Sequence, residues 1–201
     1  MTATSHRYFI INKPYDMVSQ FVSTHPVRLL GDLGFDFPEG THPIGRLDSH
    51  SEGLLILTTN KKITKLLFEA DTPHKRNYLV KVKYEVSPDS LAQLRKGVPI
   101  RVEGGGYYTT SPCEAAIVQP PEDLFANGME SKEYVPYTWL KISLTEGKFR
   151  QVRKMVGALH HRCVRLIRLS IEDLELGNLP IGGVREMEEK VFFELLKIAH
   201  G

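Results

Sequence analysis

One stretch of the sequence decides the fold: Gly45-Arg46-Leu47-Asp48-Ser49-His50-Ser51-Glu52-Gly53, followed directly by Leu54-Leu55-Ile56-Leu57-Thr58. The second half is a short, wholly apolar run, which is typical of a buried strand. The first half is a polar loop of small residues that holds the carboxylate of Asp48. A buried strand fixes such a loop, and the loop leaves the carboxylate open to a ligand. Asp48 can therefore act as a covalent nucleophile, although an aspartate in a serine-rich loop more commonly forms a turn or caps a helix.

A second motif, Lys75-Arg76-Asn77-Tyr78, opens a segment of alternating apolar and polar residues that continues to Val86. This alternation predicts a strand with one buried face. By parity, the apolar face carries five residues: Tyr78, Val80, Val82, Tyr84 and Val86. Tyr78 is then a core residue by default. The functional alternative is a ring that stacks on a nucleobase while its hydroxyl group reaches a reacting atom.

A third motif runs Glu146-Gly147-Lys148-Phe149-Arg150-Gln151-Val152-Arg153-Lys154-Met155. Apolar residues repeat at helical spacing from Phe149 to Leu159, while Arg150, Arg153 and Lys154 share a different face. This basic face can bind the phosphates of a nucleic acid, because each neutralised phosphate releases counterions. Alternatively, one arginine can pair with Asp48 and keep that carboxylate ionised and oriented.

The charges are unevenly distributed along the chain, although the net charge is only +2. Residues 148–168 contain seven basic residues, two histidines and no acid, and acidic residues predominate from Glu172 onward. Such segregation indicates a cationic face turned toward a polyanion. A solvated helix surface gives the same pattern, so charge alone leaves both interpretations open.

The rest of the chain mixes short strands and helices without a regular βαβ alternation, which favours an α+β fold over a doubly wound sheet. Residues 119–133 resemble a surface insertion. No apolar run is long enough for a membrane span, and Cys113 and Cys163 lack metal-ligand spacing, so we expect a reduced, cytosolic protein. We expect strands at residues 8–11, 53–57, 78–86, 114–118, 137–145 and 164–169, and helices at residues 59–70, 88–96, 149–159 and 186–199.

Together, the motifs closely resemble those of the RsuA/RluE-type family of ribosomal RNA pseudouridine synthases, over essentially the whole chain. Phe9-Ile10-Ile11-Asn12-Lys13-Pro14-Tyr15-Asp16 resembles the opening strand and Lys-Pro turn of that family. Residues 45–58 resemble its catalytic loop, Arg76 with Tyr78 resembles its tyrosine motif, and residues 146–155 resemble its arginine motif.

This resemblance implies the pseudouridine-synthase fold: an extended, largely antiparallel sheet flanked by helices, with a central active-site cleft. It implies that Asp48 is the nucleophile, that Tyr78 stacks on the flipped uracil and helps remove the C5 proton, and that Arg153 pairs with Asp48. Isomerisation of uridine oxidises nothing and imports no group, so we expect neither a cofactor nor a metal. The expected substrate contacts are Lys13, Arg46, Arg76, Lys148, Arg150, Gln151 and Lys154.

Many family members begin with a small S4 RNA-binding domain, whereas this sequence begins almost at once on the opening strand. We therefore expect residues 1–201 to form one catalytic domain without a separate S4 domain. The Ser51-Glu52 pair and the Asn-Lys-Pro-Tyr-Asp opening resemble the RluE branch, which modifies large-subunit ribosomal RNA. We expect that RNA as partner, a monomer, a cytoplasmic location and no membrane. Alternatives are a synthase acting on transfer RNA and a non-catalytic RNA-binding or ribosome-assembly protein with the same fold.

Overall fold

The computed structural model describes residues 6–68, 72–119 and 135–199, so most of the expected insertion at residues 119–133 lies outside the described residues. The fold is mixed α+β, as predicted, with a large, mostly antiparallel sheet and four α-helices in these ranges. The chain divides into two compact units: the first takes in residues 6–68, 72–74 and 168–199, and the second takes in residues 75–119 and 135–167. No helix in this part of the chain has the length and apolar character that crossing a membrane requires.

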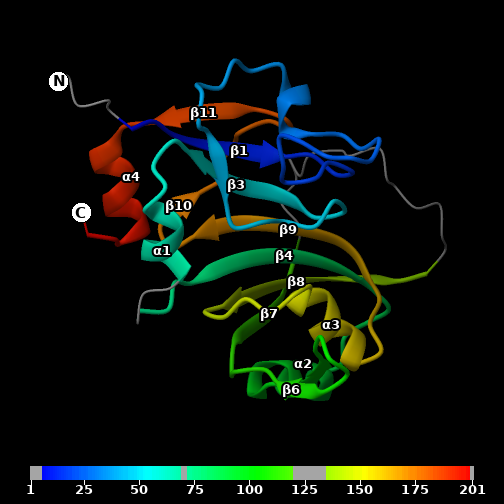
Figure 1. Cartoon of the computed structure of the whole chain (residues 1–201). Helices are drawn as coiled ribbons and strands as arrows, with labels where there is room; N and C mark the ends of the chain where they lie inside the picture. The colour runs from blue at the N-terminus through cyan, green and yellow to red at the C-terminus, as the bar shows by residue number, and fades with distance from the viewer. Residues whose placement is uncertain (1–5, 69–71, 120–134, 200–201) are drawn as a thin grey trace. The chain divides into compact units, whose positions relative to one another are not determined.

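The first unit is built around β1 (Tyr8–Lys13), which pairs antiparallel with β3 (Glu52–Thr58) and with β11 (Val184–Met187) (Figure 1). Every residue of β1 and β3 is buried, as the continuous apolar runs predict. The smaller strands of this unit are β2 (His42–Ile44), which pairs with β3, and β10 (Leu174–Glu175), which pairs with the end of β9 (Cys163–Ile171). None of these small strands was expected, because strands this short show no periodicity.

Two α-helices of the first unit are shorter than expected. Asn60, one of the two residues expected to cap the helix predicted through Ala70, has an Oδ1 that accepts from the backbone N–H of Lys62 at 3.0 Å, but α1 (Ile63–Phe68) begins only at Ile63. Ala70 lies outside the described residues. The helix predicted from Glu186 begins at Glu189, as α4 (Glu189–Leu196), because Glu186 pairs with Phe9 in β11. A 3₁₀ helix, η1 (Leu30–Leu33), lies in the turn-rich connection after β1.

In the second unit, three strands pair antiparallel in the order β4–β8–β7. Their bounds are β4 (Arg76–Lys83), β8 (Tyr137–Leu144) and β7 (Glu114–Val118). The hairpin β5–β6 and two helices complete the unit, together with the beginning of β9: β5 (Pro99–Arg101), β6 (Tyr107–Thr109), α2 (Pro88–Lys96) and α3 (Gln151–Ala158).

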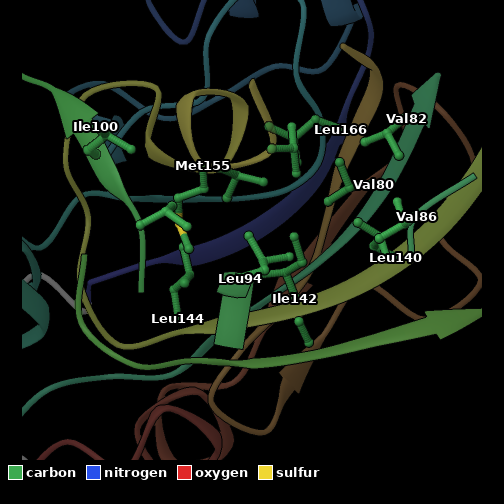
Figure 2. Close-up of a cluster of buried hydrophobic side chains, with 14 residues drawn as sticks. Val80, Val82, Val86, Leu94, Ile100, Leu140, Ile142, Leu144, Met155 and Leu166 are labelled. Carbon is green, nitrogen blue, oxygen red and sulfur yellow. The ribbon is translucent and has the colours of Figure 1, made fainter. Parts of the chain in front are cut away.

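The helices of the second unit bury their apolar faces against one face of β4 and β8. Figure 2 shows Val80 and Val82 of β4, Ile142 of β8, Leu94 of α2 and Met155 of α3 pointing toward one another. These side chains are at most 1% exposed. The alternation that predicted the buried face of β4 is thereby confirmed.

Two aromatic residues depart from the predicted pattern. Tyr84 was expected on the buried face, but β4 ends at Lys83, and the left-handed backbone of Tyr84 (φ 71°) leaves its side chain 52% exposed. Phe149 was expected to begin the helix of the arginine motif. Arg150 also has a left-handed backbone (φ 53°) and α3 begins after it, so Phe149 stays outside the helix and is 60% exposed.

Candidate functional site

The loop that carries Asp48 is fixed by hydrogen bonds on both sides of this residue. Before it, the hydroxyl group of Ser19 donates to the carbonyl oxygen of Leu47 at 2.9 Å and accepts from its N–H at 3.0 Å. After it, the N–H of Ser51 donates to the carbonyl oxygen of Asp48 at 2.9 Å and closes a turn. The side chain of Asp48 is half-buried, and β3 starts four residues further on. The loop therefore presents this carboxylate from a defined position.

Lys13 also holds this loop in place, through hydrogen bonds to backbone carbonyl oxygens. It is fully buried, and its ammonium group donates to the carbonyl oxygens of Pro14, Met17 and Ser49 at 2.8, 2.6 and 3.2 Å. Three N–H donors thus meet three backbone acceptors, and no donor remains for a phosphate. These contacts give Lys13 a positioning role that ties the end of β1 to the residue after Asp48, and its expected substrate contact stays a prediction.

Burial lowers the pKa of Lys13 to about 7 from 10.5, while Glu52 and Asp48 act in the opposite direction. Between these two values the unfolded chain binds this proton and the folded chain does not. The unfolding free energy of the wild-type protein therefore rises with pH across this window, relative to Lys13→Met, which lacks the titrating group. We expect the wild-type advantage to grow by up to about 1.4 kcal/mol per pH unit, measured by urea unfolding from neutral to alkaline pH.

Lys190→Met provides the matched control, because Lys190 is an exposed lysine on α4. Its stability difference from the wild-type protein should stay constant over the same pH range. A constant difference for Lys13→Met as well would show that the ammonium group is not held in the buried position described here.

Gly45 and Arg46 form the entrance to the Asp48 loop. Gly45 has a left-handed backbone (φ 68°), and a Cβ atom there would lie 3.1 Å from the ring of Phe68, so the position favours glycine. Arg46 is exposed, so its guanidinium group is open to an RNA phosphate, as the predicted substrate contact requires. That role stays a prediction.

Tyr78 lies in β4, opposite Ile142 of β8, and is half-buried. Its ring packs against the core cluster on the side that Val80 also faces. The parity prediction is thus confirmed, and the part of the side chain that remains exposed keeps the functional alternative open. Arg76, two residues earlier, is also half-buried, and a Cβ atom at residue 147 would lie 2.5 Å from its Nη1. Gly147 therefore allows the arginine motif to approach Arg76 closely.

Glu146 organises the arginine motif. Its carboxylate accepts from the hydroxyl group of Tyr108 at 2.6 Å, from the backbone N–H of Ser111 at 2.9 Å, and from Nε2 of Gln151. These donors lower the pKa of Glu146 although burial acts to raise it. The carboxylate thus joins the start of α3 to the segment that follows β6. The sequence pattern gave no sign of this role, because two of the three partners, Tyr108 and Ser111, lie more than thirty positions upstream.

Gln151 belongs to this network rather than to an exposed surface. It is 4% exposed, and its Oε1 accepts from the backbone N–H of Lys148 at 2.8 Å while its amide group donates to Glu146. These contacts give Gln151 a positioning role at the first residue of α3, and its expected substrate contact stays a prediction. The physical reason is the same as for Lys13: protein partners occupy the polar atoms of the side chain.

The basic residues of the motif differ in exposure. Lys148 and Arg150 are exposed, with the Lys148 ammonium group 4.8 Å from the centre of the Tyr108 ring. Lys154 is half-buried, 5.2 Å above the ring of Phe149. Arg153 is also half-buried, and its Nη1 donates to Sγ of Cys163 at 3.6 Å. The structure thus brings the basic residues of the motif together on and around the first turns of α3.

Asp48 belongs to the first unit, whereas Tyr78 and Arg153 belong to the second. Their convergence in one cleft accordingly remains a prediction. Within residues 6–68, 72–119 and 135–199, no group of three or more His, Cys, Asp or Glu side chains could hold a metal ion.

The sequence model of the RNA pseudouridylate synthase family matches residues 7–158, which is most of the chain and includes all three motifs. The chain belongs to this family and is an RNA pseudouridine synthase. The family prediction is thereby confirmed.

Two named relatives and one solved structure are similar to this chain over most of its length. The chain is 32% identical over 186 residues to ribosomal large subunit pseudouridine synthase E of Vibrio parahaemolyticus, covering 92% of this chain and 75% of that protein. It is 33% identical over 174 residues to the protein of the same name from Xanthomonas axonopodis, covering 85% and 88%. A crystal structure of a pseudouridylate synthase has the same fold, with a TM-score of 0.77 at 24% identity, over 98% of this chain and 76% of that one.

Proposed function

We propose that the chain isomerises a specific uridine in large-subunit ribosomal RNA, with Asp48 as nucleophile. Two relatives that are at least 32% identical over most of the chain carry the name ribosomal large subunit pseudouridine synthase E, and this observation supports the substrate. The fixed, half-buried position of Asp48 between the Ser19 and Ser51 hydrogen bonds supports the nucleophile. We further propose that residues 1–201 form one catalytic domain, that it acts as a monomer, and that it works in the cytoplasm, where ribosomal RNA is found.

The chemistry needs few participants. The N1–C1′ bond of uridine breaks, the base rotates, and a bond forms between C5 and C1′, after which C5 loses its proton and N1 takes one up. Nothing is oxidised and no group is added, so a nucleophile and a proton acceptor are sufficient. We assign the first role to Asp48 and propose that Tyr78 stacks on the flipped uracil and helps remove the C5 proton. Arg153 would pair with Asp48 and keep it ionised.

Flipping a base out of folded RNA costs a few kcal/mol of lost stacking and pairing. Stacking on Tyr78 and phosphate contacts from exposed basic residues must offset that cost. Arg46, Lys148 and Arg150 are exposed in their respective units, and Arg76 and Lys154 are half-buried. We propose these five residues as substrate contacts.

Mapping pseudouridines in ribosomal RNA tests the proposal directly. Cells without the gene should lack one pseudouridine in large-subunit RNA, and a plasmid copy of the wild-type gene should restore it. If the large-subunit RNA keeps all its pseudouridines and transfer RNA loses one, transfer RNA is the substrate. A protein that binds RNA without catalysis would leave every map unchanged.

Lys154→Ala tests the phosphate contacts at α3. If the Lys154 ammonium group neutralises one phosphate, its removal should weaken RNA binding and reduce the slope of log Kd against log salt concentration by about 0.7 to 1. Nitrocellulose filter binding at several salt concentrations gives both quantities. Lys190→Ala on α4 is the control for loss of one positive charge. If the wild-type protein and Lys154→Ala have equal slopes of log Kd against log salt concentration, Lys154 contacts no phosphate and is only a surface residue in water.

A further inference from the structure

A hollow in the first unit lies beside the entrance to the Asp48 loop. Its volume is about 530 Å³, within the range of pockets that hold small ligands. Three segments line it: residues 19–22 after β1, residues 43, 45 and 46 around the end of β2, and Thr64 of α1. None of the family motifs contains the first or the third of these segments, and the proposed chemistry does not use them.

The lining of the hollow suits a nucleobase. Phe21 and Pro43 provide apolar surface, and Gln20, Arg46 and Thr64 provide polar groups that can reach the edge of a base. Phe21 is held in place because its ring packs edge-on against Phe37, with centroids 5.5 Å apart. Base stacking on a fixed aromatic ring is sequence-tolerant, since every base has a π-face.

The charge around the hollow suits an RNA backbone. Residues 17–28, 42–47 and 59–68, which contain its lining, include five basic residues, and Asp16, Asp48 and Glu69 directly flank these ranges in the sequence. The lysines on either side of Thr64 are exposed. The basic residues are Arg28, Arg46, Lys61, Lys62 and Lys65. Arg46 in the lining and the exposed Lys61, Lys62 and Lys65 near Thr64 in the sequence, here called the basic rim, can contact phosphates, as basic residues do in single-stranded nucleic-acid sites.

The hollow is also connected to the proposed nucleophile. Ser19, in its wall, makes the two hydrogen bonds to Leu47, the residue before Asp48. Arg46 lies two residues before Asp48. A ligand in the hollow therefore contacts the same short loop that presents the carboxylate.

We propose that this hollow binds a second, single-stranded nucleotide of the RNA, a near neighbour of the target uridine, with its base in the hollow and its phosphates on the basic rim. The inference rests on the proposed function for the identity of the RNA. The occupied hollow selects substrates in which an unpaired nucleotide flanks the target. It thus contributes to specificity through binding rather than through the chemical step.

Val22 and Val27 allow a matched test of this site. Both are exposed in the same loop, at 81% and 42%, but only Val22 lines the hollow. Val22→Asp should raise the Kd for a fluorescent single-stranded oligouridylate by about tenfold, because a carboxylate in the wall of the hollow replaces an apolar contact to the base and repels the neighbouring phosphate. Val27→Asp adds the same charge and should change the Kd by less than about twofold. Equal changes in the two variants would overturn the proposal.

Thr64→Trp distinguishes contacts to the nucleobase from contacts to the RNA phosphates, because the larger side chain fills the hollow while the charge of the protein stays the same. We expect weaker binding of the oligouridylate and unchanged binding of inorganic polyphosphate, which has no bases. If Thr64→Trp weakens the binding of oligouridylate and polyphosphate equally, or leaves the binding of oligouridylate unchanged, no base occupies the hollow. Thermal unfolding verifies that Thr64→Trp is folded. If it is not folded, the comparison of Val22→Asp with Val27→Asp still tests the proposal.

Turnover separates this inference from the proposed function. On a large-subunit ribosomal RNA transcript, Val22→Asp should raise KM rather than lower kcat. A fall in kcat alone would assign the effect to the Asp48 loop and overturn the RNA site. If the wild-type protein forms no pseudouridine on that transcript, the proposed substrate fails, while oligouridylate binding still reports on the hollow.

Discussion

Replacement of Asp48 by Asn should abolish pseudouridine formation while leaving RNA binding intact. Asn has nearly the same shape as Asp, and the turn around this residue uses its backbone carbonyl oxygen, so the loop should keep its conformation. The amide group is not a nucleophile toward C1′ or C6 of the substrate. We expect turnover to fall by at least about 10⁴-fold, as for removal of nucleophiles in other enzymes. Single-turnover assays on ribosomal RNA measure this loss.

Asp36→Asn is the matched control, because Asp36 is exposed in the connection after β1 and no motif contains it. Its turnover should equal that of the wild-type protein. Filter binding should give the same Kd for the wild-type protein and both variants. Turnover that survives in Asp48→Asn would exclude Asp48 as the nucleophile, whereas loss of RNA binding would leave the roles in binding and chemistry unseparated.

Tyr78→Phe should produce the second largest loss. The Tyr78 ring packs against the core of its unit, and Phe preserves this packing while removing only the hydroxyl group. If that hydroxyl group helps to remove the C5 proton, kcat should fall by about 10²- to 10⁴-fold, the usual range for general acid–base catalysis. The Kd for RNA should stay within about twofold, because the stacking surface remains. Rapid-quench measurements of pseudouridine formation determine kcat.

Two further variants decide between the core and the catalytic role of Tyr78. Tyr107→Phe, at a 77% exposed tyrosine of β6, controls for loss of a phenolic hydroxyl group. Tyr78→Ala should weaken RNA binding as well, by about 1–3 kcal/mol for a lost base–aromatic stack. An unchanged kcat in Tyr78→Phe, together with unchanged RNA binding in Tyr78→Ala, would make Tyr78 a core residue only.

The elements that the sequence predicted well are those with a repeated apolar pattern. The continuous run of β3 and the alternation of β4 reflect burial of whole faces, and burial leaves a periodic trace in the sequence. Short elements leave no such trace. The hairpin β5–β6 and the strands β2, β10 and β11 have two to four residues each, and their backbone partners decide their conformation.

For the candidate site, the sequence identified the segments that carry the family motifs but not what each polar side chain in them contacts. Lys13 and Gln151 stand in the expected motifs, yet both are buried and bound to protein atoms. A lysine that binds a phosphate and a lysine that binds carbonyl oxygens are identical in sequence. The difference depends on partners such as Ser49, which is 36 residues away from Lys13. Long-range contacts of this kind have no local signature.

The two thiols of the protein have a practical consequence. Burial raises the pKa of Cys113 to about 11 and also raises that of Cys163, so both remain protonated at neutral pH. Because the thiolate is the form that reacts with maleimides, both should be slow to alkylate. A cysteine introduced at the exposed position Gln93 of α2 would then be labelled selectively without removing either native cysteine. A single fluorophore at that position would allow the protein to be followed on individual RNA molecules.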